Sequence, residues 1–174
     1  GPSYQLRTVN NARVEENIVF QKGTPRIKKK LNGKVLSLLT GGGGNDNYFH
    51  WLYDVLPRLS LCEKIIKLDE LNYFLLPNNK KKFQKESLKL LNIPEEKCIS
   101  SEYYRHITAT EIYITEHPYV ITNEASKDIQ NIPIWISQWL REKYIKENNN
   151  NSWPKKFYID RSESSSNVKD LRLI

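Results

Sequence analysis

Residues 34–59, KVLSLLTGGGGNDNYFHWLYDVLPRL, join a short apolar run to four glycines and then to a helical pattern. Residues 34–40 are nearly all apolar, which is typical of a strand buried on both faces of a parallel sheet. The glycines at 41–44 permit a sharp turn, and we expect one helix over residues 45–67. A strand, a turn and a helix form the repeating unit of an α/β domain, so this stretch predicts the fold class.

Strand and helix patterns alternate along the rest of the chain. Further strands are expected at residues 17–21, 71–76, 97–101, 103–108 and 111–115. Further helices are expected over residues 81–91 and 132–146. This alternation predicts a Rossmann-like α/β fold, with a mainly parallel sheet flanked by helices.

The last part of the chain predicts a second domain that stops soon after it begins. Residues 147–152, ENNNNS, are a polar run that cannot bury a face and are typical of a linker. A strand pattern follows at 156–161, either as the opening of a second α/β domain or as an extra strand at the edge of the first sheet. We divide the chain into a tag-removal scar at 1–3, a first α/β domain at 4–147, a linker at 148–154 and the opening of a second domain at 155–174.

Length and composition describe a globular chain with a surplus of positive charge. The chain has 174 residues, of which 39% are hydrophobic, and no apolar run long enough to cross a membrane, so we expect a soluble protein. The formal net charge of +7 fits either a general lysine surplus or an anionic partner such as a phosphorylated substrate, nucleic acid or a membrane surface. The lysines are dispersed and form no single basic stripe, so we do not expect nucleic-acid binding. Cys62 and Cys98 fit no metal or redox spacing, which favours a reducing compartment.

The helical pattern after the glycines divides into an apolar arc and a polar arc. The apolar arc, expected to pack on the sheet, consists of Leu52, Val55, Leu56, Leu59 and Ile66. The opposite arc consists of Asp46, Asn47, His50, Asp54, Pro57 and Arg58. We expect this polar arc to face a ligand, because ligands of open α/β sheets bind outside the carboxyl ends of the strands. The alternative is purely structural, with Asp46 as a helix cap and the His50–Asp54 and Asp54–Arg58 pairs as ordinary contacts one turn apart.

Pro57 interrupts the helical pattern inside the candidate site. Proline lacks the N–H that would bond to the carbonyl of Tyr53, so the helix is expected to kink or to start again there. In the alternative, the main helix begins near Pro57 and residues 47–56 form a separate short helix. In either case, the turn that carries Asp54 differs from a regular helix.

Several familiar phosphate and metal motifs are missing from the sequence. No Lys-Ser or Lys-Thr follows Gly44, and four consecutive glycines do not match a dinucleotide-binding loop. His106 and His117 form no metal-ligand spacing with His50, and there is no Asp-x-Asp pair for a divalent ion. We therefore predict neither a metal nor a cofactor.

Residues 41–59, GGGGNDNYFHWLYDVLPRL, and residues 157–162, FYIDRS, are two motifs that resemble the signatures of glycosyltransferase family 61, which includes bacterial capsular polysaccharide enzymes. Residues 41–59 resemble the first signature, and residues 157–162 resemble the second, a strand that ends in an Arg-Ser pair. The two motifs occur in the family's order, and the resemblance extends over residues 17–174, with the middle matched by pattern alone.

The resemblance implies an inverting glycosyltransferase of GT-B type, built from two α/β domains that face each other across a cleft. The first domain, 4–147, would bind the glycan acceptor, and 155–174 would open the domain that binds the nucleotide sugar. The donor would thus be a co-substrate held mainly by a second half that this chain does not contain. Family members of this kind imply cytoplasmic synthesis of surface or capsular polysaccharide, with association to the inner face of the membrane left open.

Inversion requires a base that removes the proton of the acceptor hydroxyl as its oxygen attacks the anomeric carbon. Asp54 is the first candidate and His50 the second, and the residue that is not the base would orient the other. The predicted substrate contacts are Gly43, Gly44, Asn45, Asn47, Tyr48, Trp51 and Arg58. Arg161 and Ser162 would bind the donor diphosphate, with weaker support from Arg58.

The main alternative is a non-catalytic module that binds a polysaccharide or a partner protein. Its stacking surfaces would be the aromatic side chains of Tyr48, Trp51, Tyr53 and Trp135. Titration of the chain with nucleotide sugars and with oligosaccharides would separate the two hypotheses. Tight binding of a nucleotide sugar would contradict the proposed division into domains, because the first domain alone is not expected to bind one tightly.

Overall fold

The computed structural model describes residues 27–40, 47–104, 106–120, 122 and 125–145. Its centre is a four-stranded sheet made of β1 (Lys29–Ser37), β2 (Tyr73–Leu76), β3 (Cys98–Ser100) and β4 (Ile107–Ile114). The strands lie in the order β3-β2-β1-β4, and every neighbouring pair is parallel. The predicted α/β fold with a parallel sheet is therefore confirmed.

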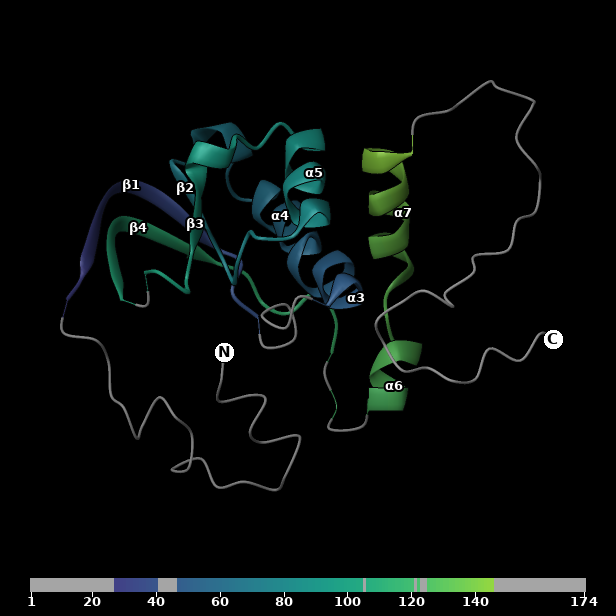
Figure 1. Ribbon diagram of the computed structural model, residues 1–174. Coiled ribbons are helices and arrows are strands. Elements are labelled where there is room, and N and C mark those ends of the chain that lie inside the picture. Colours follow the sequence, from purple (N-terminus) through teal and green to yellow (C-terminus); the bar gives the residue numbers. More distant parts are fainter. Residues whose placement is uncertain (1–26, 41–46, 105, 121, 123–124, 146–174) are drawn as a thin grey trace.

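Helices follow β1, β2 and β4 along the chain (Figure 1). The segment after β1 consists of α3 (Tyr48–His50), a π-helical turn (Trp51–Val55) and α4 (Pro57–Glu63). The helix after β2 is α5 (Lys82–Leu90). Two helices follow β4, namely α6 (Ala125–Gln130) and α7 (Ile134–Tyr144). Short 3-10 turns lie at Leu68–Glu70 and Glu95–Lys97. In Figure 1, α4, α5 and α7 lie on the same side of the sheet, and α7 packs against both α4 and α5. Within the described ranges, none of these helices has the length and apolar character needed to cross a membrane.

Tertiary pairing sets the strand boundaries that the sequence left uncertain. The two strands expected at 103–108 and 111–115 are one strand, β4, because β4 pairs with β1 from Ile107 to Ile114. The same pairing extends β1 back to Lys29, well before the expected start. The helices expected at 81–91 and 132–146 are present as α5 and α7, whereas α6 was not predicted. The expected strands at 17–21 and 156–161, the linker at 148–154 and the opening of a second domain at 155–174 lie outside the described residues.

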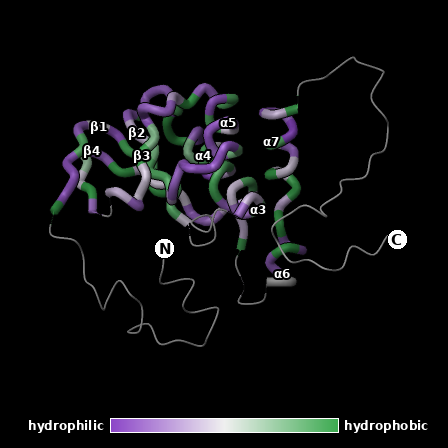
Figure 2. Tube along the Cα trace, viewed as in Figure 1, coloured by the Kyte–Doolittle hydropathy of each residue, from purple (hydrophilic) through white to green (hydrophobic). Residues whose placement is uncertain are grey.

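Hydrophobic side chains are buried on both faces of the sheet. On the face toward the helices, the core cluster includes Leu36, Phe74 and Leu76 from the strands and Val55, Leu56 and Leu59 from the segment after β1. Figure 2 shows hydrophobic residues concentrated where β2 and α4 face each other. On the opposite face, Leu31, Val35, Leu75 and Ile99 form a second cluster. Burial on both faces explains why the central strand has a continuous apolar run in the sequence.

A glycine bulge bends β1 shortly before it meets β2. Gly33 has a φ angle of 122°, and the register with β4 shifts between Leu31 and Lys34. A Cβ at position 33 would overlap the side chain of Asn72. That side chain is fixed, because its Oδ1 accepts the Lys34 N–H at 2.8 Å. Glycine is therefore required at this position.

Candidate functional site

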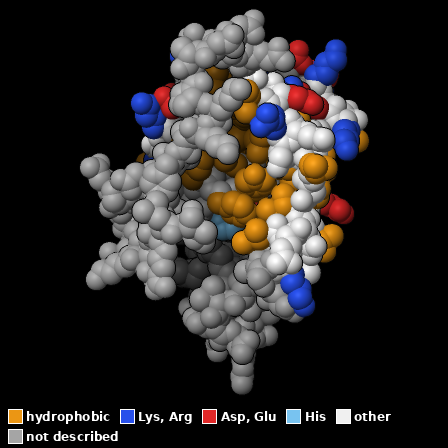
Figure 3. Space-filling view, turned by 90° about the vertical axis from the view of Figure 1, so that its right-hand side faces the viewer, with side chains coloured by type: hydrophobic (Ala, Val, Ile, Leu, Met, Phe, Trp, Pro, Cys, Tyr) orange, Lys and Arg blue, Asp and Glu red, His pale blue; other side chains and the backbone are white. Residues whose placement is uncertain are grey.

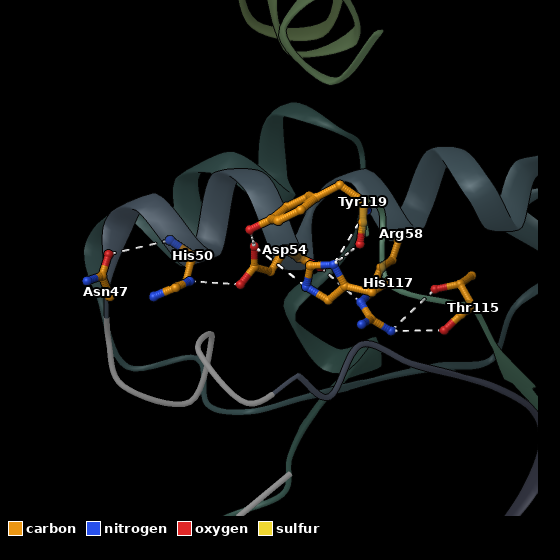
Figure 4. A network of polar contacts seen from close by, with 7 residues as sticks. All are labelled: Asn47, His50, Asp54, Arg58, Thr115, His117 and Tyr119. Carbon is orange, nitrogen blue, oxygen red and sulfur yellow. Dashed lines mark hydrogen bonds and ion pairs between the residues drawn. The ribbon is translucent and has the colours of Figure 1, made fainter. Parts of the chain in front are cut away.

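The candidate site lies at the carboxyl edge of the sheet, where two adjacent strands end. The segment of α3 and the π turn follows β1, whereas residues 115–119 follow β4, and these two strands are neighbours. The chain passes from β1 to β2 on one side, while β4 lies on the other side of β1, so the strand order reverses there. Open α/β sheets bind ligands at such a reversal. Figure 4 shows the polar side chains that meet at this point.

A π-helical turn carries Asp54 into the site. The Leu56 N–H donates to the Trp51 carbonyl at 3.0 Å, five residues back, and α4 then begins with Pro57 in its first turn. Proline is tolerated at a helix start because its missing N–H would have no partner there in any case. The expected restart of the helix at Pro57 is therefore confirmed. It follows a π turn, which is a feature found frequently at functional sites.

The second half of the polar arc is buried, contrary to the expectation from the helical wheel, whereas Asn47 is exposed and His50 is partly exposed. Asp54 is 4% exposed, Arg58 is 7% exposed, and Pro57 is also buried. This half of the arc is covered by the chain that follows β4, because Tyr119 bonds to Asp54 and Arg58 bonds to Thr115. A helical wheel leaves the face opposite the sheet in solvent, and it contains no information about a distant segment that covers this face.

Asp54 is the centre of a polar network that uses both of its carboxylate oxygens (Figure 4). Oδ2 lies 2.8 Å from Nδ1 of His50, one helical turn earlier. Oδ1 accepts the Tyr119 hydroxyl at 2.6 Å and lies 3.8 Å from Nε2 of His117, which is an ion-pair distance and too long for a hydrogen bond. These contacts from two separate segments hold the carboxylate in one orientation.

The network changes the pKa of Asp54 and of His50 in opposite directions. Burial opposes ionisation of Asp54, but its interactions with His117, His50 and Tyr119 together outweigh burial and hold its pKa well below its usual range. The hydrogen bond with Asp54 raises the pKa of His50, and burial opposes this change only in part. The pair is therefore an ionised carboxylate beside a histidine whose protonated form is stabilised.

His50 has the orientation of a general base. Its Nδ1 faces a carboxylate, which accepts hydrogen bonds and does not donate them, so Nδ1 carries the proton. In the neutral ring, Nε2 is then the basic nitrogen, and no described residue forms a hydrogen bond with it. The His50 side chain is 35% exposed, so a substrate hydroxyl can approach Nε2 from solvent.

Arg58 joins the two segments that form the site. Its Nε donates to the backbone carbonyl of Asp54 at 2.9 Å, and its Nη1 donates to the carbonyl of Thr115 at 3.0 Å. Burial lowers the pKa of Arg58, and the nearby Asp54 carboxylate opposes this change. The expected side-chain pair between Arg58 and Asp54 is thus replaced by a bond to the backbone. The guanidinium is buried, and two of its nitrogens bond to backbone carbonyls, so it positions the backbone; the contact to substrate or diphosphate stays a prediction.

Asn47 caps α3, the short helix that carries His50. Its Oδ1 accepts the N–H groups of Phe49 at 2.9 Å and of His50 at 3.4 Å. We expected Asn47 to contact substrate, and the structure shows that its side-chain oxygen fixes the beginning of the helix. Asp46, which was expected to be the cap, lies outside the described residues.

Tyr48 and Trp51, both predicted substrate contacts, differ in exposure. Trp51 is 1% exposed and its indole N–H donates to Ser87 at 2.9 Å, so this residue belongs to the core and presents no face to a ligand. Tyr48 is 57% exposed and lines a hollow of about 400 Å³ together with Leu90 and Ile145. Figure 3 shows hydrophobic side chains gathered on the side of the molecule on which α7 lies in Figure 1.

The structure adds three site residues to the predicted set and leaves five predicted ones undescribed. The additions are Thr115, His117 and Tyr119, whose only signal in the sequence is their place at or directly after the end of a predicted strand. The five that lie outside the described residues are Gly43, Gly44, Asn45, Arg161 and Ser162. In the part of the chain that is described, no group of three or more His, Cys, Asp or Glu side chains could hold a metal ion.

Comparisons with models of protein families, with characterised proteins and with solved structures find no match to this chain. The resemblance to glycosyltransferase family 61 therefore stays a prediction from two motifs. The geometry itself consists of a buried carboxylate and a partly exposed histidine that the carboxylate orients. Such a pair can remove a proton from a hydroxyl group, whatever electrophile the hydroxyl oxygen then attacks.

Proposed function

We propose that this chain is the acceptor-side half of an inverting glycosyltransferase of GT-B type, with His50 as the general base. The observation that carries the proposal is the 2.8 Å contact between Nδ1 of His50 and the buried carboxylate of Asp54. This pair lies at the strand reversal of a parallel sheet, where ligands bind in open α/β folds. The glycine-rich motif directly before the pair supports the resemblance to glycosyltransferase family 61.

The geometry favours His50 over Asp54 as the base, which reverses the order suggested by the sequence. Asp54 is buried, both of its oxygens are engaged, and its lowered pKa makes it a weak proton acceptor near neutral pH. His50 is partly exposed and keeps Nε2 without a hydrogen bond to any described residue. A base is most effective when its pKa lies near the working pH, a condition that histidine meets. Asp54 then acts as the residue that orients His50.

In the proposed reaction, Nε2 of His50 accepts the proton of an acceptor hydroxyl while the hydroxyl oxygen attacks the anomeric carbon of the donor. The new C–O bond forms as the bond to the nucleotide diphosphate breaks, and the diphosphate leaves with the electron pair. The configuration at the anomeric carbon inverts because attack and departure occur on opposite faces. The imidazolium formed on His50 is stabilised by Asp54, in the same way that the aspartate of a Ser-His-Asp triad stabilises its histidine.

The donor side of the proposal rests on the sequence resemblance. Arg161 and Ser162 would bind the diphosphate as the leaving group develops charge, because a guanidinium can pair with two phosphate oxygens. The substrates would then be a nucleotide sugar and a glycan acceptor, in the synthesis of a surface or capsular polysaccharide.

The test uses the intact protein that contains this chain, assayed for sugar transfer and for nucleotide diphosphate release with a panel of nucleotide sugars. We expect His50→Ala to lower kcat by about 10²–10⁴-fold, as is usual for loss of a general base. Added imidazole should restore part of the activity, and His106→Ala, which changes a histidine outside the network, should stay near the wild-type rate. If His50→Ala transfers sugar at nearly the wild-type rate, the assignment of His50 as the base is wrong.

A second candidate function is a non-catalytic module that binds carbohydrate. The exposed ring of Tyr48 and the partly exposed ring of Trp135 favour it, because both could stack on sugar rings. The two functions differ in how they depend on His50. Binding alone would survive His50→Ala, whereas transfer would not.

A further inference from the structure

We propose that a hollow lined by His117, next to the polar network of Asp54, binds an uncharged pyranose ring of a glycan, an inference that rests on the proposed function and names its acceptor subsite. The hollow has a volume of about 410 Å³, within the range of small-ligand sites. It lies between the end of α4, residues 114–118 and the first turn of α7. His117 lines it, and Nε2 of His117 is 3.8 Å from Oδ1 of Asp54, so the hollow adjoins the polar network that orients the proposed base.

One side of the hollow is aromatic and aliphatic. Trp135 packs against the core on one side and also lines the hollow. Ile65, at 80% exposure, and Ile114, at 75% exposure, complete this surface. Large apolar side chains that are exposed together around a concavity mark a binding surface, whereas single exposed apolar side chains are common on any protein surface. A pyranose ring fits such a wall because one of its faces consists of C–H groups that stack on an aromatic ring.

The rim of the hollow carries one positive and one negative side chain. Lys64 and Glu116 both line it, and neither side chain forms an ion pair or hydrogen bond with a described residue. Because the two charges balance, an anionic or cationic ligand gains no net attraction. Sugar hydroxyls suit this rim, since each hydroxyl can donate to the Glu116 carboxylate or accept from the Lys64 ammonium.

A second hollow adjoins the first and extends the surface toward α6 and α7. It has a volume of about 730 Å³ and shares Glu116, His117 and Pro118 with the first hollow. Its remaining wall includes Asn131 and Pro133, directly before α7. A ligand longer than one ring can therefore lie across both hollows. This indicates an oligosaccharide acceptor more than a monosaccharide.

The indole N–H signals of this chain provide a test that involves neither His50 nor sugar transfer. The chain has four tryptophans, which single Trp→Phe variants would assign in a proton–nitrogen NMR spectrum. The probes are neutral trisaccharides of glucose, of xylose and of N-acetylglucosamine, with a sulfated trisaccharide as the charged comparison. We expect a saturable shift of the Trp135 signal with at least one neutral trisaccharide, weaker binding of the monosaccharide, and no shift of the buried Trp51 signal.

Three variants make the outcome decisive. Trp135→Ala should weaken binding about tenfold or more, since a loss of 1.4 kcal/mol corresponds to one factor of ten. Glu116→Gln changes only an exposed side chain on the rim and should weaken binding without disturbing the fold. Ile134→Ala is the matched control, because Ile134 is 75% exposed on the same turn of α7 and lines neither hollow.

The acceptor subsite is refuted if no neutral trisaccharide shifts the Trp135 signal, if only the sulfated one does, or if Ile134→Ala weakens binding as much as Trp135→Ala. Saturable binding together with wild-type transfer by His50→Ala would refute the base assignment and leave the subsite standing. Sugar transfer that depends on His50, without any shift of the Trp135 signal, would refute the subsite and leave the base assignment standing.

Discussion

The substitution Asp54→Asn separates the charge of the central carboxylate from its shape. In the wild type, Asp54 accepts two short hydrogen bonds, at 2.8 Å with His50 and at 2.6 Å from Tyr119. A hydrogen bond to a charged group contributes about 1.5–3 kcal/mol, and one between neutral groups about 0.5–1.5 kcal/mol. Each bond therefore loses about 1–1.5 kcal/mol, and we expect the free energy of unfolding near pH 6 to fall by about 2–3 kcal/mol.

The same substitution should reverse the direction of the pKa change at His50. In the wild type, the bond to Asp54 holds the pKa of His50 above 6.5. Without the carboxylate, only the effect of burial remains, and burial disfavours the charged ring, so the pKa should fall below 6.5. The assay is an NMR titration of the three histidine rings, combined with urea unfolding across pH. Asp69→Asn, which removes an exposed charge, is the control.

The sign of the pH dependence follows from these changes. Because the folded pKa of His50 is raised, its stabilising contribution is fully present below pH 6.5 and is lost as pH rises through the folded value. Because the folded pKa of Asp54 is lowered, its contribution is present above pH 3.8 and is lost as pH falls through the folded value. The stability difference between wild type and Asp54→Asn should thus be largest between these limits. An unchanged pKa of His50 in Asp54→Asn would refute the network as described.

Three further predictions concern the scaffold around the site. Arg58→Lys keeps the charge but cannot reach both carbonyl groups, so we expect about 1–3 kcal/mol lower stability in urea unfolding, and an unchanged midpoint would contradict the linking role of Arg58. Gly33→Ala places a Cβ against Asn72 at a φ of 122°, so the free energy of unfolding in urea should fall by about 1–3 kcal/mol, and an unchanged value would contradict the need for glycine there. Burial raises the pKa of the Cys98 thiol to about 11, so at pH 8 it should react with a disulfide reagent about 100-fold more slowly than free cysteine, and at the normal rate in urea.

Much of the site was visible in the sequence because its parts are close along the chain. His50 and Asp54 are four residues apart, and helical periodicity by itself places such residues on one face. Pro57 likewise predicted a break in the helix, because a proline has no backbone N–H with which to donate the helical hydrogen bond. The structure confirms both the contact and the restart of the helix.

The surroundings of several predicted site residues were not foreseen, because they depend on segments that are distant in the sequence. Trp51 was expected to contact substrate, but it packs into the core and bonds to Ser87, a residue of α5. Arg58 was expected to reach a phosphate, but it bonds to Thr115 after β4. Local periodicity gives the face of a helix on which a residue lies, and it does not give what covers that face.

By itself the sequence determined the α/β class, the parallel character of the sheet and the pairing of His50 with Asp54, since apolar runs, helical periods and i,i+4 contacts are all local properties. Only the tertiary structure decided that β4 lies beside β1, and that order brings His117 and Tyr119 to the Asp54 carboxylate. The physical reason is that strand order depends on pairing between residues far apart in the chain. The same order buries the carboxylate, and this burial is what makes His50, and not Asp54, the proposed base.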